Sequence, residues 1–342
     1  MKKVLIFTSI ALTVAGPMLA GVSKKTKAEI TFRGFGKVSL AQTEKLTADQ
    51  KWADIQSDFK GQGIAGGLAG KTILKSGSSG EIIDLPQSTI SKLDHKKKEY
   101  TVGPIEKIEQ ETSGEKAETG KPEEQAAESH IKITKNEFKV EDSGEESTIN
   151  AFPVRKYLLR WLTEWEDTET GDKGSSRMET LIWTTPANET LQKAQQEEMQ
   201  FYRAYMQKIG LNVEKAQEDI LGMRWMAILE SLGKAKGQPA RDYSQAAQEM
   251  QKIKGYPIVV DGKYFVTGQK ASGEEAEGGA EEGATDVKEK LGGLLKKTLK
   301  KKPADAAAAN EPALAYRTEV LEISTPDLSP ADFQVPAGYK KK

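Results

Sequence analysis

Polar and apolar residues alternate with a period of two along most of the first half of the chain. The clearest example is the run from Phe152 to Trp165, in which successive side chains fall on opposite faces of an extended strand. One face of this run carries Tyr157, Leu159, Trp161, Thr163 and Trp165. Turn-forming residues follow at 169–174, so the pattern predicts a long hairpin whose aromatic face points inward.

Further strands are predicted around this hairpin. Three β-rich runs between Glu81 and Val102 are separated by short turns at Pro86-Gln87 and at 94–97, which is typical of an antiparallel meander. The other predicted strands are Glu29–Leu40, Ile131–Val140 and Arg177–Thr184, and Trp52–Phe59 fits either a strand or a short helix.

After Pro186 the apolar period becomes helical. Leu191, Ala194, Glu198, Phe201, Tyr205 and Ile209 recur every three or four residues. Thr185 or Asn188 can cap the start of this helix, and Gly210 can end it. A second helix is predicted from Asn212 to Gly233 and a third from Ala240 to Lys254.

Strands return after the helices. Tyr256–Val260 and Lys263–Thr267 flank Asp261-Gly262, a dipeptide typical of two-residue hairpin turns, and a last strand is predicted at Tyr316–Ile323. The order of strands, helices and strands predicts an α+β fold, in which about three helices cover one strongly curved antiparallel sheet.

Two charged segments, 109–129 and 269–311, lack apolar periodicity. Segments with so little apolar surface cannot offset the entropy lost on ordering the backbone, so both are predicted to be disordered. The pieces around them are too short to close separate sheets, so we expect one interrupted domain over residues 21–342.

The N-terminus has the form of a signal peptide. Two lysines precede the apolar run Val4–Ala15, and small residues follow up to Gly21. Cleavage is expected near Ala20, since the apolar run is too short for a retained anchor helix. The location expected is the periplasm or the outside of the cell.

The amino-acid composition excludes several kinds of covalent link, metal site and binding partner. The chain has no Cys, which excludes disulfides, thiolate metal sites and an anchor on an N-terminal Cys. Its 50 basic and 51 acidic residues produce no overall field that favours nucleic acid.

Several segments together resemble a family of exported bacterial proteins of unknown function that is grouped with the lipoprotein carriers LolA and LolB. The similar segments are Glu81–Val102, Ala151–Asn188, Gly255–Lys263 and Asp332–Lys341. The resemblance implies a half-open β-barrel whose mouth is covered by helices, with an apolar cavity for a lipid or an acylated protein.

No motif indicates catalysis. AGGLAGKT at 65–72 fits a permissive phosphate-loop pattern, but neither a buried strand before it nor a helix after it is predicted. His95 lies in a Lys-rich turn and His130 borders a charged segment, so both are predicted to be solvated, and no metal or other cofactor is expected.

Six aromatic residues are candidates for lining a ligand cavity, although such residues equally form a filled core. They are Trp161, Trp165, Trp183, Phe201, Tyr205 and Trp225. In addition, Val287–Lys302 places leucines and lysines at near-helical spacing, which fits either peripheral contact with an anionic membrane or a solvated tether.

Three hypotheses follow from the sequence. The first is a non-enzymatic envelope protein that binds a lipid or other hydrophobic ligand between sheet and helices. The second is a structural or interaction protein with a solid core, which contacts partners through its charged insertions. The third is a hydrolase whose site the sequence does not reveal.

Overall fold

The computed structural model describes residues 19–62, 76–107, 131–210, 244–268 and 311–342. Several predictions fall outside these residues and are not addressed by the structure. They are nearly all of the signal peptide (1–20), the glycine-rich loop 65–72, both charged segments except Glu311, His130, the helix expected at 212–233 with Trp225, and Val287–Lys302.

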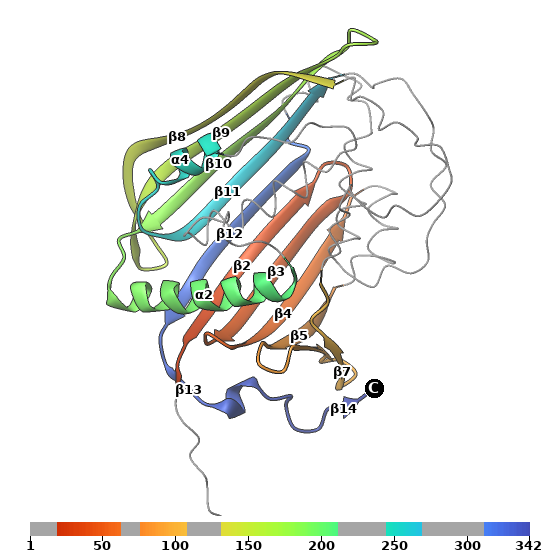
Figure 1. The fold of residues 1–342 in the computed structure, drawn as a ribbon, viewed down its shortest axis with the longest axis vertical. Coiled ribbons are helices and arrows are strands. Elements are labelled where there is room, and N and C mark those ends of the chain that lie inside the picture. Colours follow the sequence, from red (N-terminus) through yellow and green to blue (C-terminus); the bar gives the residue numbers. More distant parts are fainter. Residues whose placement is uncertain (1–18, 63–75, 108–130, 211–243, 269–310) are drawn as a thin grey trace, which may run out of the picture.

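The described chain is dominated by one curved, unclosed sheet of 12 strands (Figure 1). In order across the sheet the strands are β14 (Lys340–Lys341), β7 (Glu99–Pro104), β6 (Thr89–Asp94), β5 (Gly77–Asp84), β4 (Gln50–Gly61), β3 (Gly36–Leu46), β2 (Val22–Phe32), β12 (Leu314–Ser324), β11 (Tyr256–Gly268), β10 (Lys173–Thr185), β9 (Phe152–Asp167) and β8 (Ile131–Ile149). All neighbours are antiparallel except β14 and β7. The expected curved antiparallel sheet is therefore confirmed, with one parallel pair at its edge.

Period-two alternation locates the long strands correctly. On β9 the residues Tyr157, Leu159, Trp161 and Thr163 are buried, whereas Arg160 between them is exposed. The meander β5–β7 also forms as predicted, with turns at 85–88 and 95–98.

The N-terminal strands differ from the prediction. Glu29–Leu40 is not one strand but the middle of a hairpin, in which β2 and β3 pair over 11 residues each. The two glycines in this segment make the turn, because Gly34 and Gly36 have φ values of 76° and 131°, which L residues with a side chain rarely adopt. The segment that fitted strand or helix is the strand β4.

The prediction of a hairpin turn at Asp261-Gly262 is wrong. Both residues lie inside the continuous strand β11, with Gly262 opposite Thr180 on β10 and Tyr316 on β12. A Cβ atom on Gly262 would lie 2.3 Å from the Tyr316 ring. The glycine is required because an aromatic ring crosses its position, and not because the chain turns.

Two helices cover one side of the sheet, which we call the inner face. Helix α2 (Glu189–Lys208) crosses β12, β2 and β3 (Figure 1). It is capped by Asn188, whose Oδ1 accepts a hydrogen bond from the Leu191 N–H at 2.9 Å, and Gly210 follows it with φ 82°. Helix α4 (Ser244–Met250) is shorter than the predicted third helix and packs against β8. The described residues thus hold two of the three expected α-helices, and neither is long and apolar enough to cross a membrane.

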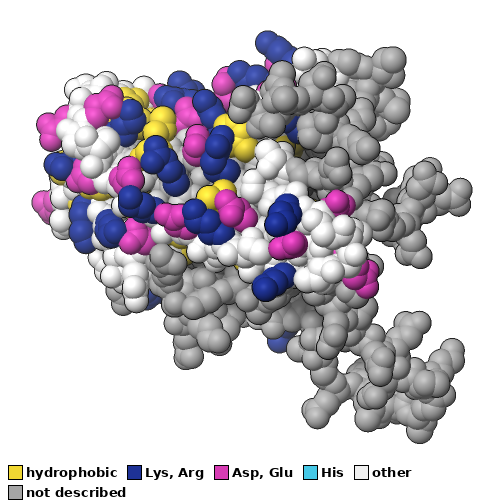
Figure 2. Space-filling model, turned by 90° about the horizontal axis from the view of Figure 1, so that it is seen from above, with side chains coloured by type: hydrophobic (Ala, Val, Ile, Leu, Met, Phe, Trp, Pro, Cys, Tyr) yellow, Lys and Arg dark blue, Asp and Glu magenta, His cyan; other side chains and the backbone are white. Residues whose placement is uncertain are grey.

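The opposite, outer face is largely polar. Cross-strand ion pairs run over it, such as Lys27 with Glu319 at 3.1 Å and Arg317 with Asp261 at 3.0 Å. Seen from above in Figure 2, the molecule likewise has cationic and anionic side chains intermixed on its surface. Because the charges of the outer face are paired and intermixed, this face is well hydrated and has no strong potential of one sign.

The C-terminal segment crosses the outer face beside β4. It includes β13 (Asp327–Leu328), which pairs with β1 (Leu19–Ala20), and the 3-10 turn Pro330–Phe333, and it ends in β14. Lys45 binds Asp332 at 2.6 Å, and Phe333 is buried. This segment therefore joins the start of β2 to the β7 edge of the sheet.

Candidate functional site

The buried side of α2 carries a carboxylate among apolar residues. Leu191, Ala194 and Phe201 are at most 2% exposed, and Glu198 between them is 1% exposed. A buried carboxylate requires a cation and hydrogen-bond donors, since its desolvation is otherwise too costly. The partners of Glu198 therefore define a polar site inside the core.

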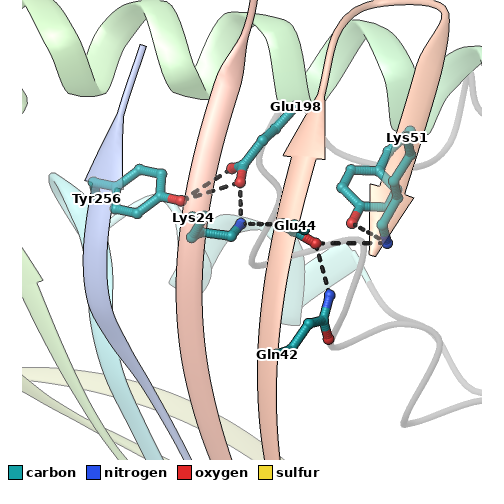
Figure 3. Close-up of polar contacts among 7 residues, drawn as sticks. Lys24, Gln42, Glu44, Lys51, Glu198 and Tyr256 are labelled. Atoms are coloured by element: carbon teal, nitrogen blue, oxygen red, sulfur yellow. Dashed lines mark hydrogen bonds and ion pairs between the residues drawn. The ribbon is translucent and has the colours of Figure 1, made fainter. Parts of the chain in front are cut away.

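The sheet supplies the first partner, Lys24 (Figure 3). Lys24 is on the inner face of β2, is 3% exposed, and its ammonium contacts the Glu198 carboxylate. On the adjacent strand β3, directly opposite in the register, Glu44 lies 2.7 Å from the same ammonium. One lysine thus joins the helix to two neighbouring strands.

Two further residues extend this cluster of charges. The Tyr256 hydroxyl at the start of β11 donates to Glu198, 3.1 and 3.2 Å from the two carboxylate oxygens. On the other side, Gln42 donates to Glu44 Oε2 at 2.8 Å. Beyond Glu44, Lys51 contacts both this carboxylate and the Tyr202 hydroxyl. We call Lys24, Gln42, Glu44, Lys51, Glu198, Tyr202 and Tyr256 the α2 clamp.

Lys51 balances the charge of the α2 clamp. Its ammonium lies 3.6 Å from Glu44 and 3.4 Å from the Tyr202 hydroxyl, and its side chain is 14% exposed. Burial alone would lower the pKa of Lys51. The Tyr202 hydroxyl and the carboxylates of Glu44 and Glu81 outweigh this effect, so the pKa is raised and the ammonium is kept. Two cations and two carboxylates then leave the clamp neutral.

The α2 clamp can hold a helix in one place on a sheet, because hydrogen-bonded charges accept few alternative positions. The α2 clamp also separates two apolar clusters on the inner face. On the α2 side of the clamp, Val22, Leu46, Ile83 and Leu85 pack with Phe201 in a buried cluster.

Apolar residues form cross-strand rows on the inner face beyond the clamp. Ile30, Val38 and Phe59 lie opposite one another on β2, β3 and β4, about 20 Å along β2 from Lys24. Phe32 and Leu314 make the adjacent row. Phe32, Val38 and Leu314 are buried, whereas Ile30, Phe35, Leu40, Phe59 and Tyr264 are only partly buried. We call these eight residues the apolar rows. Tyr264 also packs against the cluster that contains Met250 of α4, whereas the other seven residues have no α2 or α4 residue in their cluster among the described residues.

The aromatic candidates from the sequence are distributed over separate clusters. Trp161 packs with Phe138 and Met250 beside α4, and Phe201 and Tyr205 stack beneath α2 with ring centroids 6.2 Å apart. Trp183 packs with Val154 and Val259 near the β8–β9 turn, below the Lys156 ammonium. Trp165 covers Gly174. The five described candidates therefore do not meet in one group.

His95 is not a solvated surface residue as predicted. Its ring lies over Gly80, with Nδ1 2.5 Å from the Tyr339 hydroxyl and Nε2 3.3 Å from Asp54 Oδ1, and its side chain is 17% exposed. The prediction failed because the C-terminal segment, more than 200 residues away in sequence, returns to cover this turn.

Sequence reasoning missed Lys24, Glu44, Lys51 and Tyr256. A partial signal existed, since Glu198 interrupts the apolar stripe of its helix and Lys24 and Glu44 occupy inward positions of alternating strands. Which cation meets which carboxylate follows only from strand order and register. Comparison with protein-family models, with curated proteins and with solved structures gave no match.

Proposed function

We propose that this chain is an exported, non-enzymatic protein that binds a lipid or other apolar ligand against the inner face of its sheet. The observation that carries the proposal is the position of the apolar rows. Ile30, Leu40, Phe59 and Tyr264 are partly buried on the face that also holds the helices. These partly buried side chains lie side by side and keep part of their apolar surface accessible, so they offer an apolar ligand a surface on which to pack.

The architecture supports this proposal in a second way. A curved sheet that does not close, with helices on one face, fits the wall and cover of a half-open β-barrel, and the resemblance to the LolA and LolB group implies the same arrangement. The α2 clamp would keep one end of this cover in place while the apolar rows contact ligand. The ligand would be a lipid or the acyl chain of a protein.

The proposal is tested by extracting the purified protein with organic solvent for mass spectrometry and by titrating it with an apolar fluorophore. Leu40→Asp places a charge among the apolar rows and should weaken fluorophore binding roughly tenfold or more. Its neighbour Ala41 is exposed on the outer face, so Ala41→Asp is the matched control and should bind as the wild type does.

Circular dichroism and thermal melting establish that both variants fold. The proposal is lost if no lipid is extracted and the fluorophore does not bind to the wild type. It is also lost if the two folded variants bind equally well.

A further inference from the structure

The strand β8 forms one edge of the sheet and is unusually long for an edge strand. It spans 19 residues, and β9 is its only strand neighbour among the described residues (Figure 1). Long edge strands expose N–H and C=O groups that can pair with another chain, and proteins commonly cover or blunt them. An edge strand of this length can therefore pair with a further strand whose backbone groups and side chains match it.

The backbone groups of every second residue of β8 face outward from this edge. The Val140 N–H donates to Glu249 Oε2 of α4 at 2.8 Å, so it points away from β9. Alternate residues of a strand direct their backbone groups to the same side, so Phe138 and Asn136 also face the edge. The register with β9 runs without a bulge from Lys135 to Asp142, which makes this stretch straight enough to pair.

The outer-face side chains along this stretch alternate in charge. Lys135, Glu137, Lys139 and Glu141 are 46%, 52%, 57% and 40% exposed. They pair along the strand, Lys135 with Glu137 at 3.0 Å and Lys139 with Glu141 at 2.9 Å. A strand with this order of charges is complementary to itself when reversed.

We propose that β8 is a dimerisation edge that pairs antiparallel with β8 of a second copy of this chain, about a two-fold axis at Phe138. This register places Lys135 opposite Glu141 of the second copy, and Glu137 opposite Lys139. Each pairing occurs twice because a two-fold interface uses the same surface on both copies. Opposite charges in directly facing positions stabilise a sheet.

The backbone satisfies the same register. Phe138 lies opposite Phe138 of the second copy, and Asn136 lies opposite Val140 of the second copy. Residues whose backbone groups face outward therefore meet each other, as hydrogen bonding between antiparallel strands requires. A two-fold axis at Glu137 or Lys139 would instead place like charges opposite each other. In the dimer, the Val140 N–H donates to the Asn136 carbonyl of the second copy and no longer to Glu249. In the monomer, Glu249 acts as the cap of the open edge.

The proposal is tested on the full chain by sedimentation velocity over a range of concentrations. The wild type should show a concentration-dependent dimer. Glu137→Lys and Lys139→Glu each put like charges opposite one another twice, so each should raise the dimer dissociation constant roughly tenfold or more. Lys25→Glu, an exposed change on β2, is the control and should dimerise as the wild type does.

The decisive measurement is rescue. The double variant Glu137→Lys with Lys139→Glu restores complementarity within one chain and should dimerise again. A mixture of the two single variants should form a heterodimer, although each alone is monomeric. A wild type that remains monomeric throughout, single variants that dimerise normally, or a mixture that stays monomeric would each overturn the proposal.

Discussion

Replacing Lys24 by Met removes the cation that Glu44 and Glu198 share beneath α2. Glu44 keeps Lys51 at 3.6 Å, and Glu198 keeps the Tyr256 hydroxyl. No other cation of the described residues forms an ion pair with Glu198. The variant therefore leaves one buried carboxylate without a counter-charge. Removing one partner of a buried pair costs about 3–5 kcal/mol of folding stability.

The loss is measured by urea unfolding followed by tryptophan fluorescence. With a urea m value of about 3 kcal/mol/M, a loss of about 4 kcal/mol lowers the unfolding midpoint by roughly 1.3 M. Lys25→Met is the matched control on the same strand. Lys25 and its partner Glu322 are 52% and 67% exposed, and an exposed pair contributes at most about 1 kcal/mol, so its midpoint should fall much less.

A second substitution distinguishes charge from packing. Glu198→Gln keeps an acceptor for the Tyr256 hydroxyl but removes the unpaired charge. The double variant Lys24→Met with Glu198→Gln should therefore recover most of the lost stability, while Glu44 stays paired with Lys51. If Lys24→Met loses less than about 1 kcal/mol, or if the double variant is no more stable than Lys24→Met, the ion pairs do not anchor α2.

Three other predictions concern stability. Gly262→Val drives a side chain into the Tyr316 ring and should lower the free energy of unfolding, measured in urea, by about 1–3 kcal/mol or more. Lys45 is the main cause of the lowered pKa of Asp332, which falls from 3.8 to about 2. A carboxyl group whose pKa is lower in the folded than in the unfolded chain stabilises the fold at pH values above the unfolded pKa. Roughly 2 kcal/mol of unfolding free energy should therefore be lost as the pH falls from about 4 to 2, and Asp332→Asn should abolish this pH dependence. Asn188→Ala removes the cap of α2 and should lower the unfolding free energy by about 1 kcal/mol, while a threonine at this position should restore most of it.

Local pattern was sufficient to predict several elements. The alternation from Tyr157 to Thr163 marks the buried face of β9 because successive side chains of any strand point to opposite sides. The helical period after Pro186, the Asn188 cap and Gly210 define α2 for equally local reasons. These features depend on covalent geometry and on contacts within a few residues.

Other features were decided only by tertiary structure. Asp261-Gly262 has the local character of a turn, yet pairing with β10 and β12 on both sides keeps it extended. The strand β12 joins β2 although nearly 300 residues separate them, and this neighbour relation completes the sheet.

The candidate sites show the same division. The sequence by itself determined that Glu198 lies on the apolar side of a helix and that charges alternate along β8. Only the folded chain decided that Lys24 and Tyr256 reach that carboxylate, and that β8 lies at an edge where its charges can meet a second copy. The physical reason is that periodicity reports which face of an element is buried. The partner on that face is set by strand order and register, which depend on the whole sheet.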